Sequence, residues 1–425
     1  MHFKKTTHCR LCKNASLIPL LSLGDQSFTG IFPKDDKMEV PIGPLELVKC
    51  QKCDLVQMGH NFALDQLYGH NYGYRSGLNG SMVRHLNQKV QKILQIVDLT
   101  DGDLVIDIGS NDGTTLRAYP DRNLEFVGID PTGAKFKAYY PSDVRLIPDF
   151  FSGELVRKHC KKDKAKVITS IAMFYDLEDP VSFMKDIESI LHPDGIWVFE
   201  QSYLKAMIDT NSYDTICHEH LEYYGVKQIH QMAELAGLKI LQIEFNDVNG
   251  GSFSVVAAKK DSKLPQDIKT VETILNEEEK TGLYSMATFE KFSKRVQEHK
   301  VFVRKFFDWA HDERKRVLGY GASTKGNVLL QYCGITGAEM PCIAEVNEDK
   351  FGSFTPGSLI PIVSEAAAKR MKPDYFFVLP WHFRAGILNR ETDFQKSGGK
   401  FIFPLPEFNI IPVDPAFESA RKQFL

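Results

Sequence analysis

Apolar and polar positions follow a repeating order through the middle of the chain. Between residues 104 and 202, short apolar runs (LVIDI, EFVGI, KVITSI and GIWVFE) alternate with segments whose apolar residues have helical spacing. This order predicts parallel strands in one sheet with helices on both faces. Two further alternating runs flank the Asn249-Gly250-Gly251-Ser252 segment, so the sheet is predicted to end in an antiparallel hairpin.

The flanking regions have different patterns. Residues 60 to 100 carry apolar side chains near helical spacing and predict a helix, and residues 262 to 312 predict a charged helical connector. Beyond the connector, a strand, a glycine turn and a helix precede three more apolar runs, which predict a second doubly wound sheet. Because 425 residues exceed what one hydrophobic core supports, we predict an α/β protein of several parts. Their predicted boundaries are 1–65, 66–260, 261–312 and 313–425.

Composition narrows the class of protein. Hydrophobic residues make up 43% of the chain and charged residues 25%, which is ordinary for a folded protein. A net charge of -3 provides no positive field for nucleic acid or anionic lipid. The N-terminus lacks the apolar run of a secretory signal, and no stretch approaches the roughly 20 apolar residues of a membrane span. We therefore expect a cytoplasmic protein with reduced cysteines.

Four of the eight cysteines form two Cys-x-x-Cys pairs. Cys9 and Cys12 make the first pair, Cys50 and Cys53 make the second, and 37 residues separate the two pairs. Two such pairs favour a tetrahedral zinc site over two unrelated pairs, and the surrounding glycines and prolines argue against a thioredoxin-like strand and helix. Since protein would fill all four positions, residues 1–65 are predicted to hold structural zinc.

A glycine turn joins the first strand of the central region to a helix that begins near Thr114. Asp130 ends the next strand, 21 residues after the first glycine, where a carboxylate accepts hydrogen bonds from ribose hydroxyls. Acidic and amide side chains in the turn suit a cationic cofactor better than a pyrophosphate. S-adenosylmethionine has a sulfonium and an ammonium group, so 66–260 is predicted to bind it. The predicted cofactor-binding residues are Asp107, Gly109, Asn111, Asp112, Gly113 and Asp130.

Three ionisable side chains follow one another at His218, Glu219 and His220. In an extended backbone the two histidines share a face, whereas in a turn all three spread apart. Metal binding is disfavoured, since the pair of histidines lacks the i, i+4 spacing of helical zinc sites. A hydrogen-bonded structural turn is an alternative. General acid-base catalysis is the preferred interpretation.

Taken together, these motifs resemble one enzyme family. The motifs are the paired cysteines, the D-x-G-x-N-D-G turn, residues Tyr72 to Ser76, the segment from Cys217 to Tyr224 and a late glycine turn at 319–327. The chain is similar over nearly its whole length to the nucleotide-linked sugar C-methyltransferases of branched deoxysugar pathways. The resemblance implies methyl transfer from S-adenosylmethionine to C-3' of a nucleotide-linked 4-keto-6-deoxyhexose.

The resemblance also implies roles for particular residues. His220 matches the position of the base that forms an enolate, and Glu219 would orient the imidazole or bind a sugar hydroxyl. Cys217 stands where the family often has a tyrosine. Either the donor to the enolate oxygen has moved, with Tyr72, Tyr74 and His218 as candidates, or the sugar is presented differently. The tyrosines of residues 68–77 are either surface anchors or part of a lid.

The late glycine turn is expected to bind the acceptor. Its hydroxyls and one cation suit anionic oxygens, although the order of residues is not that of a Walker loop. A duplicated sheet with a vestigial turn is the alternative. By family likeness, 313–425 is predicted to bind the phosphates or sugar of a small-molecule acceptor. The predicted substrate-binding residues are Tyr72, Tyr224, Ser323, Thr324, Lys325, Asn327 and His382.

Other functions remain open at this point. O- or N-methylation of a sugar nucleotide needs less carbon acidity than C-methylation. The two glycine turns also fit a two-site oxidoreductase. A zinc-containing RNA-binding module is disfavoured, because the charge is balanced and basic residues do not alternate with aromatic ones. Nothing in the sequence implies a nucleic acid, a membrane or an obligate protein partner.

Overall fold

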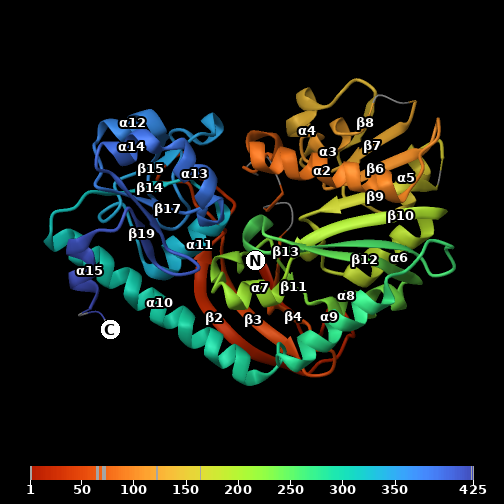
Figure 1. The fold of residues 1–425 in the computed structure, drawn as a ribbon, viewed down its shortest axis with the longest axis horizontal. Helices are drawn as coiled ribbons and strands as arrows, with labels where there is room; N and C mark the ends of the chain where they lie inside the picture. The colour runs from red at the N-terminus through yellow and green to blue at the C-terminus, as the bar shows by residue number, and fades with distance from the viewer. Residues whose placement is uncertain are drawn as a thin grey trace.

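Three large β-sheets organise the protein in this computed structural model (Figure 1). The N-terminal sheet lies between a seven-stranded sheet and a six-stranded C-terminal sheet, and one long helix passes beneath the N-terminal and C-terminal sheets. The residues that the structure describes are 2–63, 67–68, 73–120, 123–162, 164–422 and 424.

The seven-stranded sheet has the order β12-β13-β10-β9-β6-β7-β8. Its five strands from β10 to β8 are parallel, and β13 is antiparallel to both β10 and β12. The predicted fold class is thereby confirmed, including the final hairpin. The sequence prediction missed one strand, β8. The strands are β6 (Leu104–Ile108), β7 (Glu125–Ile129), β8 (Val144–Ile147), β9 (Ala165–Ile171), β10 (Leu191–Ser202), β12 (Leu238–Asn246) and β13 (Ser252–Lys259).

Helices cover both faces of this sheet because its strands are buried on both sides. On one face, α2 (Gly80–Ile96) packs Val90 and Ile93 against the sheet, while α6 (Pro180–Ile190) and α8 (Val226–Leu235) cover the other. The predicted helix over 60–100 was too long. Residues 60–62 form a strand, and α2 begins only where the Asn79 side chain caps it by accepting the Ser81 N–H.

The N-terminal sheet combines segments that are distant in sequence. Its order is β11-β4-β3-β2, and β11 comes from the middle of the chain, shortly after His220. A separate pair joins β1 (Phe3–Lys5) to β5 (His60–Phe62). The strands of the larger sheet are β2 (Leu17–Ser27), β3 (Ile42–Cys50), β4 (Val56–Met58) and β11 (Glu222–Tyr223).

The C-terminal sheet has the order β16-β15-β14-β17-β18-β19, in which β19 is antiparallel and the other strands are parallel. The long helix α10 (Met286–Asp312) follows α9 (Ile268–Lys280) and shares one hydrophobic core with this sheet and the N-terminal sheet. The sequence prediction missed β16 and β19, which are only three residues each. The strands are β14 (Val317–Tyr320), β15 (Ile343–Glu345), β16 (Ile362–Ser364), β17 (Tyr375–Val378), β18 (Lys400–Phe403) and β19 (Asn409–Ile411).

Among the described residues, no helix combines the length and the apolar character that crossing a membrane requires.

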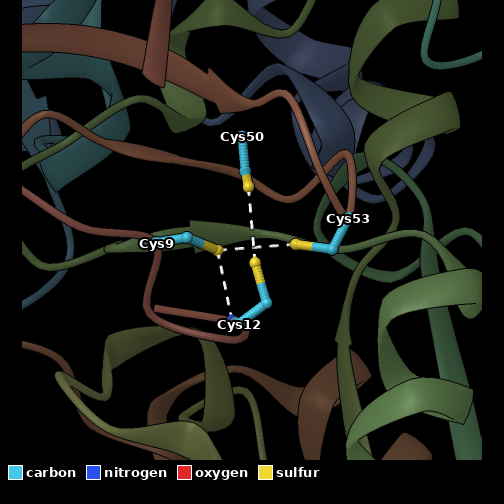
Figure 2. Close-up of side chains that lie close together, drawn as sticks. All are labelled: Cys9, Cys12, Cys50 and Cys53. Carbon is cyan, nitrogen blue, oxygen red and sulfur yellow. Dashed lines mark hydrogen bonds between the residues drawn. The ribbon is translucent and has the colours of Figure 1, made fainter. Parts of the chain in front are cut away.

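The four paired cysteines converge beside the N-terminal sheet, as Figure 2 shows. Their sulfur atoms lie within 4.8 Å of one another, with Cys9 Sγ 3.4 Å from Cys53 Sγ and Cys12 Sγ 3.5 Å from Cys50 Sγ. Four thiolates at the usual zinc distance of about 2.3 Å stand about 3.8 Å apart. The spacing and the all-thiolate donor set therefore fit a four-cysteine zinc site that leaves no open position for chemistry.

Removal of this zinc is expected to destabilise the protein. Metal analysis should find about one zinc per chain, and Cys12→Ser should lower both the zinc content and the unfolding temperature, because the ion crosslinks the ends of the N-terminal segment. Cys160→Ser is the matched control, since that thiol lies outside the cluster. Unchanged unfolding and metal content in Cys12→Ser would contradict the assignment.

Candidate active site

The glycine turn after β6 and the acid after β7 lie together, since the two strands are parallel neighbours. Gly109, Asn111 and Gly113 have positive φ angles of 70°, 52° and 74°. The Asn111 N–H donates to Asp130 Oδ2 at 2.7 Å, which fixes the carboxylate beside the turn. Asp130 Oδ1 already accepts the N–H and the hydroxyl of Thr132, so capacity for a ribose hydroxyl remains at Oδ2.

Asp107 is a second buried carboxylate at this turn. Its side chain accepts a 2.5 Å hydrogen bond from Thr169 Oγ1, and burial raises its pKa to about 7. Among the described residues, no lysine or arginine acts on the pKa of Asp107. A cationic ligand beside Asp107 would restore its charge, so Asp107 and Asp130 fit the ammonium group and ribose of S-adenosylmethionine.

The side chains of Asn111 and Asp112 hold the segment that precedes α2. Asn111 Oδ1 accepts the Ser76 N–H at 2.9 Å, and Asp112 Oδ2 accepts the Gly77 N–H at 3.0 Å. A Cβ atom at Gly77 would lie 2.5 Å from Asp112 Oδ2, so this approach requires glycine. These two side chains thus hold the segment, while the Asn111 backbone is engaged by Asp130 and by the Tyr140 hydroxyl.

Two tyrosines assigned to the site belong to this region. The Tyr74 side chain is 46% exposed, while its carbonyl oxygen accepts a hydrogen bond from Asn111 Nδ2. Its hydroxyl lies beside Ser76 and near Asp112 in a desolvated place, which raises the pKa of Tyr74 to about 12, so its role as a donor stays a prediction. Tyr72 lies outside the described residues.

Residues 217–220 form a tight turn, in which the His220 N–H donates to the Cys217 carbonyl oxygen. His220 Nδ1 lies 2.9 Å from the Thr215 carbonyl oxygen. Because a carbonyl only accepts, Nδ1 carries the proton and Nε2 keeps its lone pair. The Tyr175 ring packs on the imidazole at 4.3 Å. His220 is thus held in the form that a general base requires.

The neighbouring His218 occupies a different environment. Its side chain is buried between Phe28 and Phe62, and its Nε2–H donates to the Gly43 carbonyl oxygen at 3.2 Å. Nδ1 accepts the Thr29 N–H at 3.4 Å, so both ring nitrogens have partners. Burial lowers the pKa of His218 to about 4. These contacts give His218 a packing role and disfavour the catalytic role considered from the sequence.

Glu219 points toward the N-terminal part of the chain. Its carboxylate accepts a hydrogen bond from Thr29 Oγ1 at 3.4 Å and packs against Gly30, where a Cβ atom would lie 2.1 Å away. Burial raises the pKa of Glu219 and also that of the adjacent Cys217 thiol, which lies fully inside the protein. The Cys217 thiol is therefore a poorer hydrogen-bond donor than the phenol of the tyrosine that the family often has at this position.

The C-terminal glycine turn reaches the same place. A Cβ atom at Gly30 would be 3.9 Å from Thr324 Oγ1, and Asn327 Nδ2 donates to the Thr29 carbonyl oxygen at 2.7 Å. Ser323 Oγ caps α11 (Thr324–Cys333) by accepting the Gly326 N–H, so this hydroxyl is partly engaged. The N-terminal segment, the turn at 217–220 and the C-terminal part thus meet around Glu219.

Lys325 of the C-terminal part acts electrostatically on the turn at 217–220. Its Nζ donates to the Asn249 carbonyl oxygen at 2.9 Å. Burial, together with the positive charge of Lys325, lowers the pKa of both His220 and His382 to about 3. His382 Nδ1 is buried and has no hydrogen-bond partner among the described residues. Lys325, His382 and His220 therefore share one electrostatic environment.

Asp214 of this region was not singled out from the sequence. The Trp381 indole N–H donates to Asp214 Oδ2 at 2.8 Å, which ties η7 (Trp381–Phe383) to η4 (Tyr213–Thr215). Asp214 stands between Tyr213 and Thr215, and a single aspartate there gives no signal in sequence. Conversely, Tyr224 was assigned to the substrate, but it is buried and its ring stacks on Phe174. That contact places Tyr224 in the hydrophobic core of the seven-stranded sheet.

Family models match three consecutive parts of the chain. Residues 9–68 match a "Putative zinc binding domain", residues 80–243 a methyltransferase domain, and residues 247–406 a C-methyltransferase C-terminal domain. Their order agrees with the four-cysteine site, the seven-stranded sheet and the C-terminal sheet described above.

A relative and several solved structures are similar to the chain. The CcbJ methyltransferase of Streptomyces caelestis is 12% identical, with a TM-score of 0.32 over 41% of this chain and 89% of that one. An S-adenosylmethionine-dependent methyltransferase of Mesorhizobium loti is 14% identical, with a TM-score of 0.32 over 39% and 95%. The assignment does not depend on these two. The C-methyltransferase NovU of Streptomyces niveus is 30% identical over 96% of this chain and 97% of that protein. This chain therefore belongs to the family of S-adenosylmethionine-dependent C-methyltransferases that includes NovU.

Proposed function

We propose that this protein methylates C-3' of a nucleotide-linked 4-keto-6-deoxyhexose and that His220 is the base. The observation that carries the proposal is the 2.9 Å hydrogen bond between His220 Nδ1 and the Thr215 carbonyl oxygen, which leaves Nε2 free to take a proton. A C–H bond next to a ketone is acidic enough for an imidazole base, because the carbonyl oxygen takes up the negative charge.

His220 Nε2 takes the proton from C-3', and the electron pair of that C–H bond forms the enolate double bond while the C-4' carbonyl electrons move to oxygen. S-adenosylmethionine, when bound, would supply an electrophilic methyl group: as the carbanionic carbon takes the methyl, the methyl–sulfur bond would break with its electrons on sulfur, which leaves S-adenosylhomocysteine. Asp107 and Asp130 hold the donor beside the sheet edge. Holding the reacting groups in line contributes about 7 to 11 kcal/mol to such a step.

The C-terminal residues bind the acceptor. Lys325 supplies a positive charge for a phosphate, and Thr324 and the buried His382 supply polar groups around it. A bound diphosphate would offset the charge of Lys325, and that charge lowers the pKa of His220. Acceptor binding would therefore raise the basicity of His220 toward the operating pH, where a general base works best.

The proposed reaction is tested by substrate mass and isotope exchange. Incubation with S-adenosylmethionine and a nucleotide-linked 4-keto-6-deoxyhexose should add about 14 mass units, one CH₂, to the sugar. In deuterated water the C-3' hydrogen should exchange, and His220→Gln should slow this exchange by about 100-fold or more, because a positioned base is worth that much. Mass spectrometry and proton NMR measure both effects.

His230→Gln is the control for this substitution, since His230 lies on the surface of α8 and contacts Glu234. It should leave exchange unchanged. Full exchange in His220→Gln would assign the base to another residue, and a methyl group on oxygen or nitrogen would refute C-methylation.

Loss of the Lys325 charge should change the pH dependence of the reaction. Since that charge lowers the pKa of His220, Lys325→Met should raise this pKa. Neutral His220 is needed, so the acid limb of kcat/KM should move to higher pH, and KM for the sugar nucleotide should rise. Lys325→Arg keeps the charge and should keep the acid limb. An unchanged acid limb in Lys325→Met would show that the charge of Lys325 does not lower the pKa of His220.

Asp130 should matter for the methyl donor and much less for the acceptor. Asp130→Asn removes a charged acceptor of hydrogen bonds, so S-adenosylmethionine affinity should fall by about 10- to 100-fold in calorimetry. Asp149→Asn, at an exposed aspartate, is the control. Equal affinity for the donor in Asp130→Asn would place the adenosine elsewhere.

A further inference from the structure

Arg10 lies between the zinc ligands Cys9 and Cys12, yet its side chain turns inward. It is 3% exposed, and its guanidinium donates to the carbonyl oxygens of Met58 at 2.8 Å and His60 at 3.2 Å. Arg10 Nε forms an ion pair with Glu222 Oε1 at 3.4 Å. The guanidinium therefore connects the zinc site to strand β11.

The partners of Arg10 at β11 directly follow the proposed base. The Leu221 carbonyl oxygen accepts the Met58 N–H at 2.8 Å and lies 3.5 Å from Arg10 Nη1. The Leu221 N–H donates to the Tyr175 carbonyl oxygen at 2.7 Å. Leu221 is thus held on one side by the N-terminal sheet and on the other side by Tyr175, whose ring packs on the His220 imidazole.

A buried ion pair often adds little to the stability of a protein. Removing both charges from water costs several kcal/mol per ion, and apolar replacements of both partners are often as stable. The guanidinium is a rigid, planar fork with five donors, so it fixes the relative positions of the groups that it binds. Glu222 is buried, and this burial raises its pKa well above the usual range although the charge of Arg10 acts in the opposite direction. The pair is better explained by placement of β11 than by stability.

We infer that Arg10 is a positioning residue, which sets the location of His220 by holding Leu221 and Glu222 against the zinc site. This inference rests on the proposed role of His220 as the base. It gives the four-cysteine site a function beyond folding, because the first Cys-x-x-Cys pair fixes the backbone of Arg10.

The test uses the full-length protein with both charges replaced. Arg10→Met/Glu222→Leu leaves no buried charge without a partner, and it should keep its zinc, its unfolding temperature and its affinity for S-adenosylmethionine. Hydrogen exchange measured by mass spectrometry should become faster in residues 213–223, and kcat should fall by about 10- to 100-fold, as expected for a misplaced catalytic group. KM for the sugar nucleotide should change much less.

Two single variants complete the experiment. Arg10→Lys keeps the charge but loses the planar fork of donors. It should therefore show the same faster hydrogen exchange in residues 213–223 as the double variant, with a smaller loss of kcat. It also replaces the double variant should that one not fold. Lys227→Met is the matched control, because Lys227 Nζ pairs with Asp54 at 2.7 Å beside the same zinc site and contacts neither Leu221 nor Glu222. It should leave kcat and exchange in 213–223 unchanged.

Folded, zinc-loaded variants with wild-type kcat and wild-type exchange in 213–223 would overturn the inference. So would an equal loss of kcat in Lys227→Met, which would indicate general destabilisation. The exchange measurement needs no substrate, so it decides the role of Arg10 even where the wild-type protein fails to methylate the sugar nucleotide. Failure of the proposed function appears separately, as absence of product from the wild-type protein.

Discussion

The structure depends on how one short turn, residues 217–220, is held between the sheets. Its last residue, His220, is fixed by a hydrogen bond to Thr215, and the chain that follows joins the N-terminal sheet as β11. Glu219 in the same turn packs against Gly30. Backbone hydrogen bonds in a buried place are costly to leave unmade, so the turn has one stable position. The chemistry assigned to this protein requires that single position.

Burial and charge then set the properties of the groups around the turn. His218 and His220 are two residues apart in sequence, but His218 uses both ring nitrogens in the core, whereas His220 retains a free Nε2. Lys325 comes from the C-terminal part and lowers the pKa of His220. In the proposed function, proton abstraction and acceptor binding would be coupled through the charge of this lysine, which acts together with burial on the pKa of His220.

Much of the fold could be predicted from the sequence because its patterns are local. The alternation of strands and helices, the final hairpin and the two Cys-x-x-Cys pairs all depend on residues near one another. Strand β11 could not be found, because two residues form it only by pairing with β4, far away in sequence. The helix over 60–100 was predicted too long because apolar spacing does not show where Asn79 caps it. Arg10 and Asp214 were missed because their partners are also distant.

The proposal that His220 removes a proton from carbon is tested most directly by the structure of a complex with S-adenosylhomocysteine and a nucleotide-linked 4-keto-6-deoxyhexose. The account predicts that His220 Nε2 lies about 3 to 3.5 Å from C-3', a distance typical of reacting groups. Lys325 should lie beside the diphosphate. A complex in which another side chain approaches C-3', with His220 remote from the sugar, would contradict the account.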